Sequence, residues 1–478
     1  MAASDRPHLG SNQMGVADIV FFVLALIAPV GVVVSLTVLS IALGAGAGTP
    51  GIYVIAGVVM TLFAVGYVRM SRRVTNAGAF YAYISRGLGR TAGTAAAYVA
   101  VVAYNAAAIG VLGALAFFAH LSLGAVLGVH LSWQVWAIIA FALVAVLSYF
   151  EVTLSAKVLG VALLAEVAVL LALDVGVLID KGFHGFSLDV FSPSVVFSSG
   201  FGVSLMLAFG SFVGFEATAI YGEEAKDPAR TVPRATYIAI AAIAIFYLLT
   251  TWAVVTAYGV DAAQAAALKD PAGFMFAAES QYVGNLATKG MQVLVVTSLF
   301  ASFLAVHASA SRYHFALARD GVLPRALART HPKNGAPIGG SAAQLALTAI
   351  VVIAFALAGQ DPYLVMGIGL YGVGVIGIVS LQALTSFAVI RYFLKERTGE
   401  SRLATLVAPL LGGIGLSVGV VLMATNYGTL TGSTIPWINA LPWLLVVAAV
   451  VGALVSVVRQ RVRSTEIDSA LEPAARPA

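Results

Sequence analysis

The chain has 478 residues, of which 60% are apolar and only 10% are charged. A soluble protein normally carries about 25% charged residues, so this composition excludes a water-soluble globular domain and indicates a polytopic membrane protein. The sequence contains no cysteine, which excludes disulfides and thiolate metal sites, and its net charge of +5 comes from short basic loops rather than from a nucleic-acid-binding surface.

Apolar runs of about twenty residues recur along the whole chain, and each is long enough to cross a ~30 Å hydrocarbon core as a helix. They predict an all-α membrane protein of twelve transmembrane helices without an inserted soluble domain. The expected spans lie near residues 16–43, 51–68, 94–119, 133–150, 158–179, 196–222, 235–258, 290–311, 341–358, 363–390, 403–423 and 437–458.

Lysine and arginine fall almost entirely on one side of this arrangement. The loops of the opposite side hold only Lys181, Lys269 and Lys289, so the other 23 of the 26 basic residues share one side with both termini. Because basic loops are retained in the cytoplasm, we expect residues 1–15 and 459–478 to be cytoplasmic tails that flank a membrane domain at 16–458.

Two spans carry helix-breaking residues near their middles. Span 6 contains Gly210-Ser211-Phe212-Val213-Gly214-Phe215-Glu216, in which two glycines weaken the helix and a carboxylate is costly without water. Span 1 contains Ala28-Pro29-Val30-Gly31, in which the proline removes a backbone donor. Broken backbone at membrane depth either lines a cavity or is buried in protein. These two segments are therefore the expected substrate site, although Pro and Gly are also common in ordinary membrane helices.

The positions of the two breaks predict an internal repeat. Transporters with inverted repeats bind substrate at discontinuous helices in corresponding places of each half. Spans 1 and 6 are the first members of two five-span sets, at about residues 16–179 and 196–390. Spans 11 and 12, at about 403–458, are then accessory helices.

Three longer motifs resemble those of the amino acid–polyamine–organocation (APC) superfamily of permeases. Gly214-Phe215-Glu216, followed by the run Glu-Glu-Ala-Lys-Asp-Pro-Ala-Arg-Thr-Val-Pro-Arg at 223–234, looks like the family signature of span 6. Residues 76–89 are similar to its 2–3 loop, and residues 311–324 to its 8–9 loop. The matches are spread over spans 1 to 10. The resemblance implies the five-plus-five inverted-repeat (LeuT-like) fold of a bacterial-type amino acid or amine permease, with substrate at the unwound parts of spans 1 and 6.

Span 1 departs from the family pattern in one respect. Many members have a Gly-Ser-Gly-like run that clasps the substrate carboxylate, whereas this chain has one glycine and no hydroxyl in Ala28-Pro29-Val30-Gly31-Val32. A zwitterion still suits two broken helices, because half-helix N-termini attract anions and C-terminal carbonyls attract an ammonium. The missing clasp gives a polyamine or another amine more weight as the alternative substrate.

Polar residues within the spans are candidates for ion coupling. Glu166 lies near the midplane of span 5, at a place where some family members carry a lysine linked to proton coupling or replacing a sodium ion. A carboxyl group there is able to bind a proton, a sodium ion or a substrate ammonium, or to bond to a neighbouring helix in its protonated form. His307 on span 8 is either a proton relay or a packing residue. Ser298 and Ser302 offer hydroxyls to an ion or pack against another helix.

Three tyrosine or asparagine residues are expected pocket walls, because spans 3, 8 and 10 flank the site in this fold. They are Tyr104 and Asn105 in span 3 and Tyr371 in span 10, with packing or interfacial roles as the alternative. Phe212 and Phe215 flank the span 6 break and are expected to close over the substrate, as aromatic gates do in this architecture.

Charged residues continue beyond the break. Glu216 either complements the dipole of the helix that it begins, or acts in gating or in holding a substrate amine. Asp174, eight residues beyond Glu166, is interpreted as an interfacial residue. The cytoplasmic run that follows span 6 is either a solvated face or an inner gate whose ion pairs break on opening. Its members are Glu224, Lys226, Asp227, Arg230 and Arg234.

Two other functional classes fit the sequence less well. A membrane enzyme is disfavoured by the absence of zinc-protease and serine-hydrolase motifs and by the scatter of the seven histidines, so we expect no catalytic residue, metal or cofactor. A channel should show a selectivity-filter loop or a charged pore ring, and neither is found. The sequence therefore predicts a secondary active transporter of the cytoplasmic membrane. Its expected partners are the lipid bilayer, a small amino acid or amine, and a coupling ion, for which we expect a proton because no sodium cage is evident.

Overall fold

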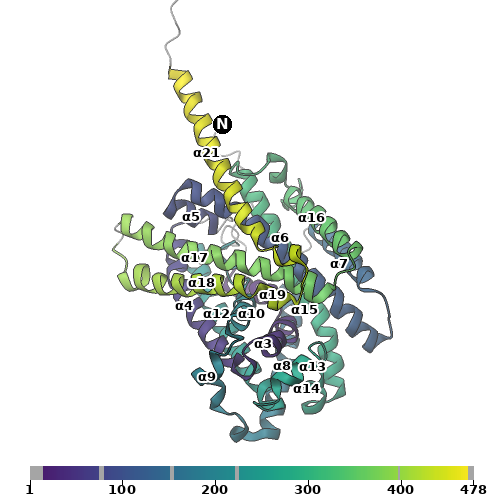
Figure 1. Cartoon of the computed structure of the whole chain (residues 1–478). Helices are drawn as coiled ribbons and strands as arrows, with labels where there is room; N and C mark the ends of the chain where they lie inside the picture. Colours follow the sequence, from purple (N-terminus) through teal and green to yellow (C-terminus); the bar gives the residue numbers. More distant parts are fainter. Residues whose placement is uncertain (1–13, 75–79, 151–155, 221–224, 397–398, 472–478) are drawn as a thin grey trace, which may run out of the picture.

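The computed structural model describes residues 14–74, 80–150, 156–220, 225–396 and 399–471. Every regular element in these ranges is a helix (Figure 1), and one isolated bridge joins Met14 to Ala225. That bridge places the start of the first span beside the start of the seventh.

The first five spans are formed by the following elements. Span 1 consists of α1 (Val16–Ile27), α2 (Pro29–Val32), the π-helical η2 (Val33–Thr37) and α3 (Val38–Leu43). The next four spans, with a preceding 3-10 turn and one loop helix, are η3 (Gly46–Gly48), α4 (Thr49–Ser71), α5 (Phe80–Leu88), α6 (Arg90–Leu127), α7 (Trp133–Phe150) and α8 (Ala156–Gly185).

The second set of spans begins with a divided helix and includes several short connecting helices. Up to span 8 the elements are η4 (Leu188–Phe191), α9 (Pro193–Val196), α10 (Phe201–Phe212), α11 (Ala217–Ile220), α12 (Pro228–Tyr258), α13 (Ala263–Lys269), α14 (Phe274–Tyr282) and α15 (Asn285–Arg319). Spans 9 and 10 are formed by η6 (Arg325–Ala328), α16 (Ile338–Leu357), the π-helical η7 (Pro362–Gly369) and α17 (Leu370–Glu396). The accessory part contains η8 (Leu403–Val407), α18 (Ala408–Thr425), α19 (Tyr427–Thr431), α20 (Pro436–Asn439) and α21 (Trp443–Leu471).

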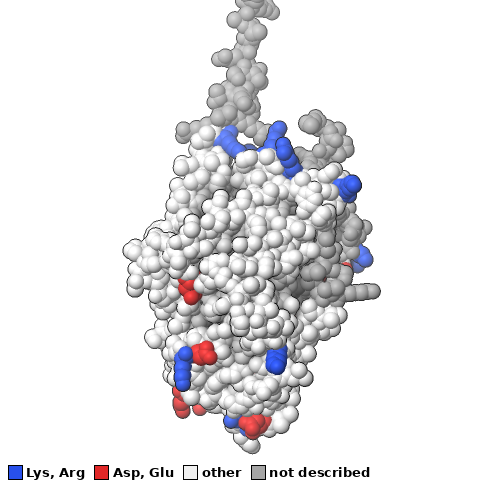
Figure 2. All heavy atoms as spheres, turned by 90° about the vertical axis from the view of Figure 1, so that its right-hand side faces the viewer, with Lys and Arg blue, Asp and Glu red and all other residues white. Residues whose placement is uncertain are grey.

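Eleven helices in the described ranges are long and apolar enough to cross a membrane, and Phe201–Phe212 is a shorter apolar helix. The shorter helix is the first half of span 6, so the predicted set of twelve spans is accounted for by eleven long spans, which include the interrupted span 1, and by span 6. Figure 2 shows basic side chains at the end of the molecule from which the C-terminal helix projects, and a broad middle region almost free of charge. This distribution is typical of a protein whose middle is surrounded by hydrocarbon.

Burial separates the inner from the outer spans. In span 3 (α6), 89% of the most apolar stretch is buried inside the protein, whereas in span 4 (α7) only 17% is buried. α6 packs against α15, α17 and α21, so it lies at the centre of the bundle. Glycine permits its close approach to span 10, because a Cβ atom on Gly110 would lie 2.4 Å from the backbone nitrogen of Tyr371.

The first spans of the two five-span sets are both interrupted, as predicted. In span 1 the interruption separates α1 from α2, and in span 6 it separates α10 from α11. The ends of these half-helices expose backbone groups that have no partner within the helix. Spans 3, 8 and 10 surround the span 1 break and complete the candidate site.

Candidate substrate-binding site

The break in span 1 is centred on Ala28. This residue has φ 54° and ψ 75°, and it is the single non-glycine residue with positive φ in the described part of the chain. Pro29 disfavours the α conformation in the residue before it and is itself well suited to begin the next helix. A left-handed alanine costs on the order of 1–2 kcal/mol, so the surrounding structure must hold this bend in place.

The break in span 6 is held by its own carboxylate. Gly214 has φ 122°, and a Cβ atom at this position would lie 2.2 Å from Cδ2 of Leu26, so the turn lies directly against span 1. The Glu216 carboxylate is fully buried and accepts a hydrogen bond from the Gly214 N–H and another from the Tyr104 hydroxyl, each at 2.9 Å. Glu216 therefore stabilises the interrupted backbone and connects it to span 3.

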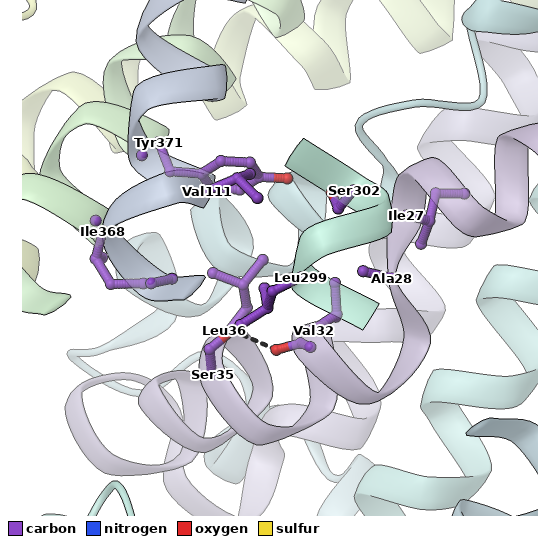
Figure 3. Close-up of a pocket in the computed structure, with 14 residues that line it drawn as sticks. Ile27, Ala28, Val32, Ser35, Leu36, Val111, Leu299, Ser302, Ile368 and Tyr371 are labelled. Carbon is purple, nitrogen blue, oxygen red and sulfur yellow. Dashed lines mark hydrogen bonds between the residues drawn. The ribbon is translucent and has the colours of Figure 1, made fainter. Parts of the chain in front are cut away.

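A small cavity lies beside the break in span 1 (Figure 3) and has a volume of about 30 Å³. Spans 1, 3, 8 and 10 all contribute to its walls. The lining residues are Ile27, Ala28, Gly31, Val32, Ser35, Leu36, Gly110, Val111, Ala114, Leu299, Ser302, Gly367, Ile368 and Tyr371.

The walls of this cavity are mostly apolar, and none of the lining side chains is charged. The hydroxyl of Ser35 is used within span 1, where it donates to the Gly31 carbonyl. The Tyr371 hydroxyl donates to the Gly210 carbonyl at 2.8 Å, which connects span 10 to the broken end of α10. Gly210 and Tyr371 also line a second, smaller space of about 10 Å³ next to the first.

The predicted substrate residues therefore separate into two groups. Ala28, Gly31 and Tyr371 line the main cavity, and Gly210 lines the adjoining space. The other predicted substrate residues line neither of these two spaces. They are Pro29, Val30, Ser211, Phe212, Gly214, Phe215, Glu216, Tyr104 and Asn105.

Several of this second group have partners elsewhere in the bundle. The Ser211 hydroxyl lies 3.0 Å from that of Tyr53 in span 2. The amide nitrogen of Asn105 lies 3.2 Å from Nε2 of His314 in span 8. Tyr104, besides its bond to Glu216, stacks on Tyr313 with 4.7 Å between ring centroids.

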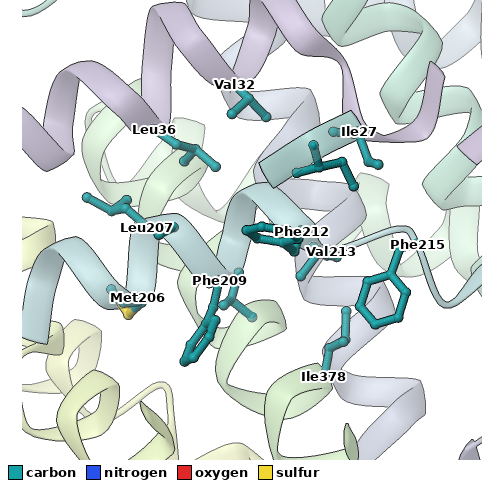
Figure 4. Packing of buried hydrophobic residues seen from close by; sticks show 14 of the residues in the cluster. Ile27, Val32, Leu36, Met206, Leu207, Phe209, Phe212, Val213, Phe215 and Ile378 are labelled. Carbon is teal, nitrogen blue, oxygen red and sulfur yellow. The ribbon is translucent and has the colours of Figure 1, made fainter. Parts of the chain in front are cut away.

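The two phenylalanines that flank the break point in different directions (Figure 4). Phe212 is buried at the end of α10, and Phe215 lies beyond the turn at Gly214. Phe215 packs on Phe63 at 6.0 Å and on Tyr67 at 6.3 Å between ring centroids. Tyr67 in turn contacts Phe80 and Tyr83 of α5, and all five rings are buried. We call these five residues the aromatic cluster; it joins the span 6 break to the 2–3 loop.

The predicted ion-coupling residues of spans 5 and 8 meet at the span 1 break. Oε2 of Glu166 accepts a hydrogen bond from the Ser298 hydroxyl at 2.6 Å and from the Val30 N–H at 3.2 Å. The Gly31 N–H donates to Ser298 Oγ at 3.3 Å. Glu166 is 4% exposed, so this carboxyl group is held within the bundle. Glu166 and Ser298 each accept from one backbone amide at the start of the second half of span 1.

Ser302 and His307 lie farther along span 8 and differ in their surroundings. The Ser302 hydroxyl donates to the Leu26 carbonyl at 2.6 Å, next to the break and the cavity. His307 faces span 9 instead, where Nδ1 contacts Gln344 and Nε2 lies 2.8 Å from the Ser341 hydroxyl. The structure therefore groups Ser302 with Glu166 and Ser298, and leaves His307 outside that group.

The charged run after span 6 forms only a local contact among its described members. Arg230 Nε lies 3.7 Å from Asp227 Oδ2 within one helical turn, and both side chains are more than half exposed. The backbone N–H of Lys226 donates to the Met14 carbonyl, Arg234 is exposed, and Glu224 lies outside the described residues.

An ion pair on this side was missed by sequence reasoning. Arg69 at the end of span 2 contacts Glu400 after span 10, with 2.9 Å between nitrogen and oxygen, and Arg73 lies 3.8 Å from the same carboxylate. The cluster of arginines after span 2 was the available signal, but hydropathy does not show which distant acid it meets.

Several known proteins resemble this chain in sequence. The family model for amino acid permeases matches residues 18–462. The low-affinity putrescine importer PlaP of Escherichia coli (strain K12) is 24% identical over 385 residues, which cover 78% of this chain and 80% of the importer. The branched-chain amino acid permease BcaP of Lactococcus lactis subsp. cremoris is 26% identical over 335 residues, which cover 65% of this chain and 69% of that permease.

A shorter match has higher identity. An uncharacterized transporter of Mycobacterium tuberculosis is 37% identical over 150 residues, so the match spans 30% of this chain and only 33% of that relative.

The fold is also found among solved structures. A manganese transporter of Eremococcus coleocola superposes with a TM-score of 0.55 at 11% sequence identity, and the match covers 96% of this chain and 97% of that one. Likeness at this identity concerns the fold, and it confirms the predicted LeuT-like architecture of five plus five helices. Together with the family match over nearly the whole chain, it shows that this protein is a membrane transporter that belongs to the amino acid permease family.

Proposed function

We propose that this protein takes up an amino acid with an apolar side chain by proton symport and alternating access. The observation that carries the proposal is the cavity at the span 1 break, which has apolar walls without a charged side chain and lies next to the buried carboxyl group of Glu166. The cavity, which is small in this conformation, would widen to hold the substrate, and Glu166 would hold the coupling proton.

The chemistry of the walls favours an apolar amino acid. Carbonyl groups at the C-terminal end of α1 carry the negative end of a helix dipole, which suits the substrate ammonium. Apolar side chains of Val32, Leu36, Val111 and Ile368 suit an aliphatic substrate side chain. The similarity to a branched-chain amino acid permease supports this choice.

A second candidate is a small amine such as putrescine. It is favoured by the hydrogen bonds that the Val30 and Gly31 amides already make to Glu166 and Ser298, because those amides are then not free for a substrate carboxylate. It is also supported by the similarity to a putrescine importer. Against it, a diamine would need acidic partners at both ends, and the lining residues include none.

The contact between Glu166 and Val30 suggests how proton and substrate are coupled. An ionised carboxylate accepts strongly from the Val30 N–H and the Ser298 hydroxyl. A proton on Glu166 weakens it as an acceptor and releases the Val30 amide for the substrate carboxylate. Proton and substrate then bind together, as symport requires.

The proposed orientation of the protein in the membrane rests on the distribution of its basic side chains. Figure 2 shows mainly basic side chains at the end from which α21 projects and both basic and acidic side chains toward the opposite end, and Figure 1 places α5 of the 2–3 loop at the first of these ends. Under the positive-inside rule this end faces the cytoplasm. We therefore propose that both termini are cytoplasmic and that α9, α13 and α14 lie on the outside of the cell membrane.

The test is uptake of radiolabelled leucine and putrescine into proteoliposomes, with and without an inward pH gradient. We expect accumulation of leucine that depends on the pH gradient, persists when choline replaces sodium, and is inhibited more strongly by unlabelled leucine than by putrescine. Putrescine uptake that leucine does not inhibit would select the second candidate. A strict requirement for sodium would refute proton coupling, and large single-channel currents without counterflow would refute a carrier.

Tyr371→Phe tests the cavity wall. The variant keeps the ring but removes the hydroxyl that donates to the Gly210 carbonyl, so spans 6 and 10 lose a connection beside the substrate. A hydrogen bond contributes about 0.5–1.5 kcal/mol, so we expect KM for uptake to rise by roughly 2- to 10-fold. Initial-rate measurements check this. An unchanged KM would show that the connection does not shape the site.

A further inference from the structure

Two acidic side chains outside the substrate cavity lie at the end of the bundle opposite to α5. Asp174 is on α8, and Glu279 is on the short helix α14 that packs against α8, α12, α15 and η2. Figure 1 shows α14 beside α8 and α13 at this end. The two carboxyl groups are close enough to influence each other's ionisation.

Most of the oxygen atoms of this pair have no hydrogen-bond partner. Glu279 is 0% exposed, and neither of its carboxyl oxygens receives a hydrogen bond. Oδ2 of Asp174 accepts from the Thr250 hydroxyl at 2.9 Å, but the buried Oδ1 has no partner. Three carboxyl oxygens therefore lie buried without a donor. An ionised carboxylate in such surroundings is strongly disfavoured.

No basic side chain of the described residues forms an ion pair with these acids. On α8, Lys181 lies 3.4 Å from Asp180 and 5.8 Å from the centre of the Tyr282 ring. The Tyr282 hydroxyl donates to the Ala257 carbonyl at 2.7 Å. On α12, the Tyr258 hydroxyl donates to the Phe274 carbonyl at 2.6 Å.

The remaining elements packed on α14 bring no neutralising charge either. The near end of α15 carries Lys289, which is exposed, and η2 (Val33–Thr37) contains no titratable residue. The negative charge of two ionised acids would therefore remain uncompensated at this site.

Binding of a proton reduces this uncompensated negative charge and requires no further ligands. Two carboxyl groups that influence each other cannot both ionise easily, and a single proton held by one of them removes one charge and supplies one donor. A divalent cation needs more ligands, since calcium takes six to eight oxygens. The described residues contain no group of three or more His, Asp or Glu side chains that converge as metal ligands.

We propose that Asp174 and Glu279 form a second proton-binding site, separate from Glu166, that holds one proton at neutral pH. The bound proton keeps α14 packed on span 5 and on the π-helical segment of span 1. This site lies at the end of the bundle that we propose faces the outside of the cell. It does not depend on which substrate the cavity binds.

The environment of Glu279 agrees with this assignment. Burial, and secondarily the neighbouring Asp174, raise the pKa of Glu279 from its usual 4.5 to about 7. Because the folded protein holds the proton more tightly than the unfolded chain, this group's contribution to stability is complete below about pH 4.5 and is lost as the pH rises to about 7.

The test uses the full-length protein in nanodiscs and measures the infrared band of protonated carboxyl groups from about pH 4 to about pH 9. We expect the wild type to lose a band with a midpoint near pH 7, and Glu279→Gln to lack this component. Asp174→Asn should move the midpoint to lower pH by removing a like charge, which a merely structural role would not do. Asp180→Asn, an exposed acid on the same helix, is the matched control and should leave the midpoint unchanged.

Glu166→Gln separates this proposal from the transport mechanism. The Glu279 component should persist in that variant even if Glu166 proves unrelated to coupling. A band whose titration is the same in the wild type and Glu279→Gln would overturn the proposal. A wild-type midpoint of the Glu279 component that shifts with sodium or potassium would also overturn it, because the site would then bind a metal cation.

Discussion

Glu166→Gln is expected to abolish accumulation of substrate against its gradient while leaving exchange across the membrane intact. Glutamine has nearly the same shape and, like the protonated acid, is a neutral and weaker acceptor for Ser298 and the Val30 N–H, but it cannot gain or lose a proton. In a one-proton symporter, a pH difference of about two units sustains on the order of 100-fold accumulation. In the variant, the inside and outside concentrations should become roughly equal.

Two measurements in proteoliposomes check this result: uptake under a pH gradient and counterflow without one. The control is Asp180→Asn on the same helix, which removes an exposed acid and should keep the accumulation of the wild type. Gradient-driven accumulation that survives in Glu166→Gln would show that another group carries the coupling proton. Loss of both accumulation and counterflow would show that the carboxylate is needed for the site itself rather than for coupling.

Gly214→Ala is expected to destabilise the protein strongly and to eliminate transport. At φ 122° an alanine is strained by about 1–3 kcal/mol, and its Cβ atom would meet Leu26 Cδ2 at 2.2 Å and Ile27 Cγ1 at 3.2 Å. Relief of that overlap requires span 1 to move away from the span 6 break, which costs typically a further 1–3 kcal/mol. Thermal unfolding in detergent at one fixed scan rate, together with uptake, measures both effects.

Gly284→Ala is the matched control for this substitution. Its φ of 117° is nearly the same as that of Gly214, but a Cβ atom there meets nothing within 4 Å. The control should therefore show the backbone strain alone, with a smaller decrease in melting temperature and with transport retained. Equal decreases in the two variants would mean that contact between the broken spans contributes little.

Much of the fold was predictable because hydrocarbon imposes a simple rule on sequence. A helix must satisfy its own backbone groups in the membrane, so apolar runs of sufficient length predict the spans. The breaks at Pro29 and Gly214 were equally visible, since proline and positive-φ glycine act through the backbone. Helices α13 and α14 were not expected, because they are short and lack a long apolar run.

Side-chain direction explains most of what the sequence did not show about the site. Glu166 and Ser298 were identified as intramembrane polar residues, but only packing brings them to the Val30 amide. Phe215 is three residues from Phe212, yet the turn at Gly214 sends the two rings to different neighbours. Glu279 was not predicted as a site residue, because an acid between two spans is usually exposed. Its burial arises from tertiary contacts.

The aromatic cluster gives the transport cycle a dependence on temperature. Its five buried rings join the span 6 break to α5, so in the proposed transport cycle a path from the cavity to the cytoplasm would separate some of them. Each large aromatic side chain buries about 150–250 Å² of surface, and exposure of apolar surface to water raises the heat capacity. In the proposed cycle, the inward-open form would therefore have a larger heat capacity than the closed form. The equilibrium between them, and with it the turnover rate, is expected to vary with temperature along a curved rather than a straight Arrhenius plot.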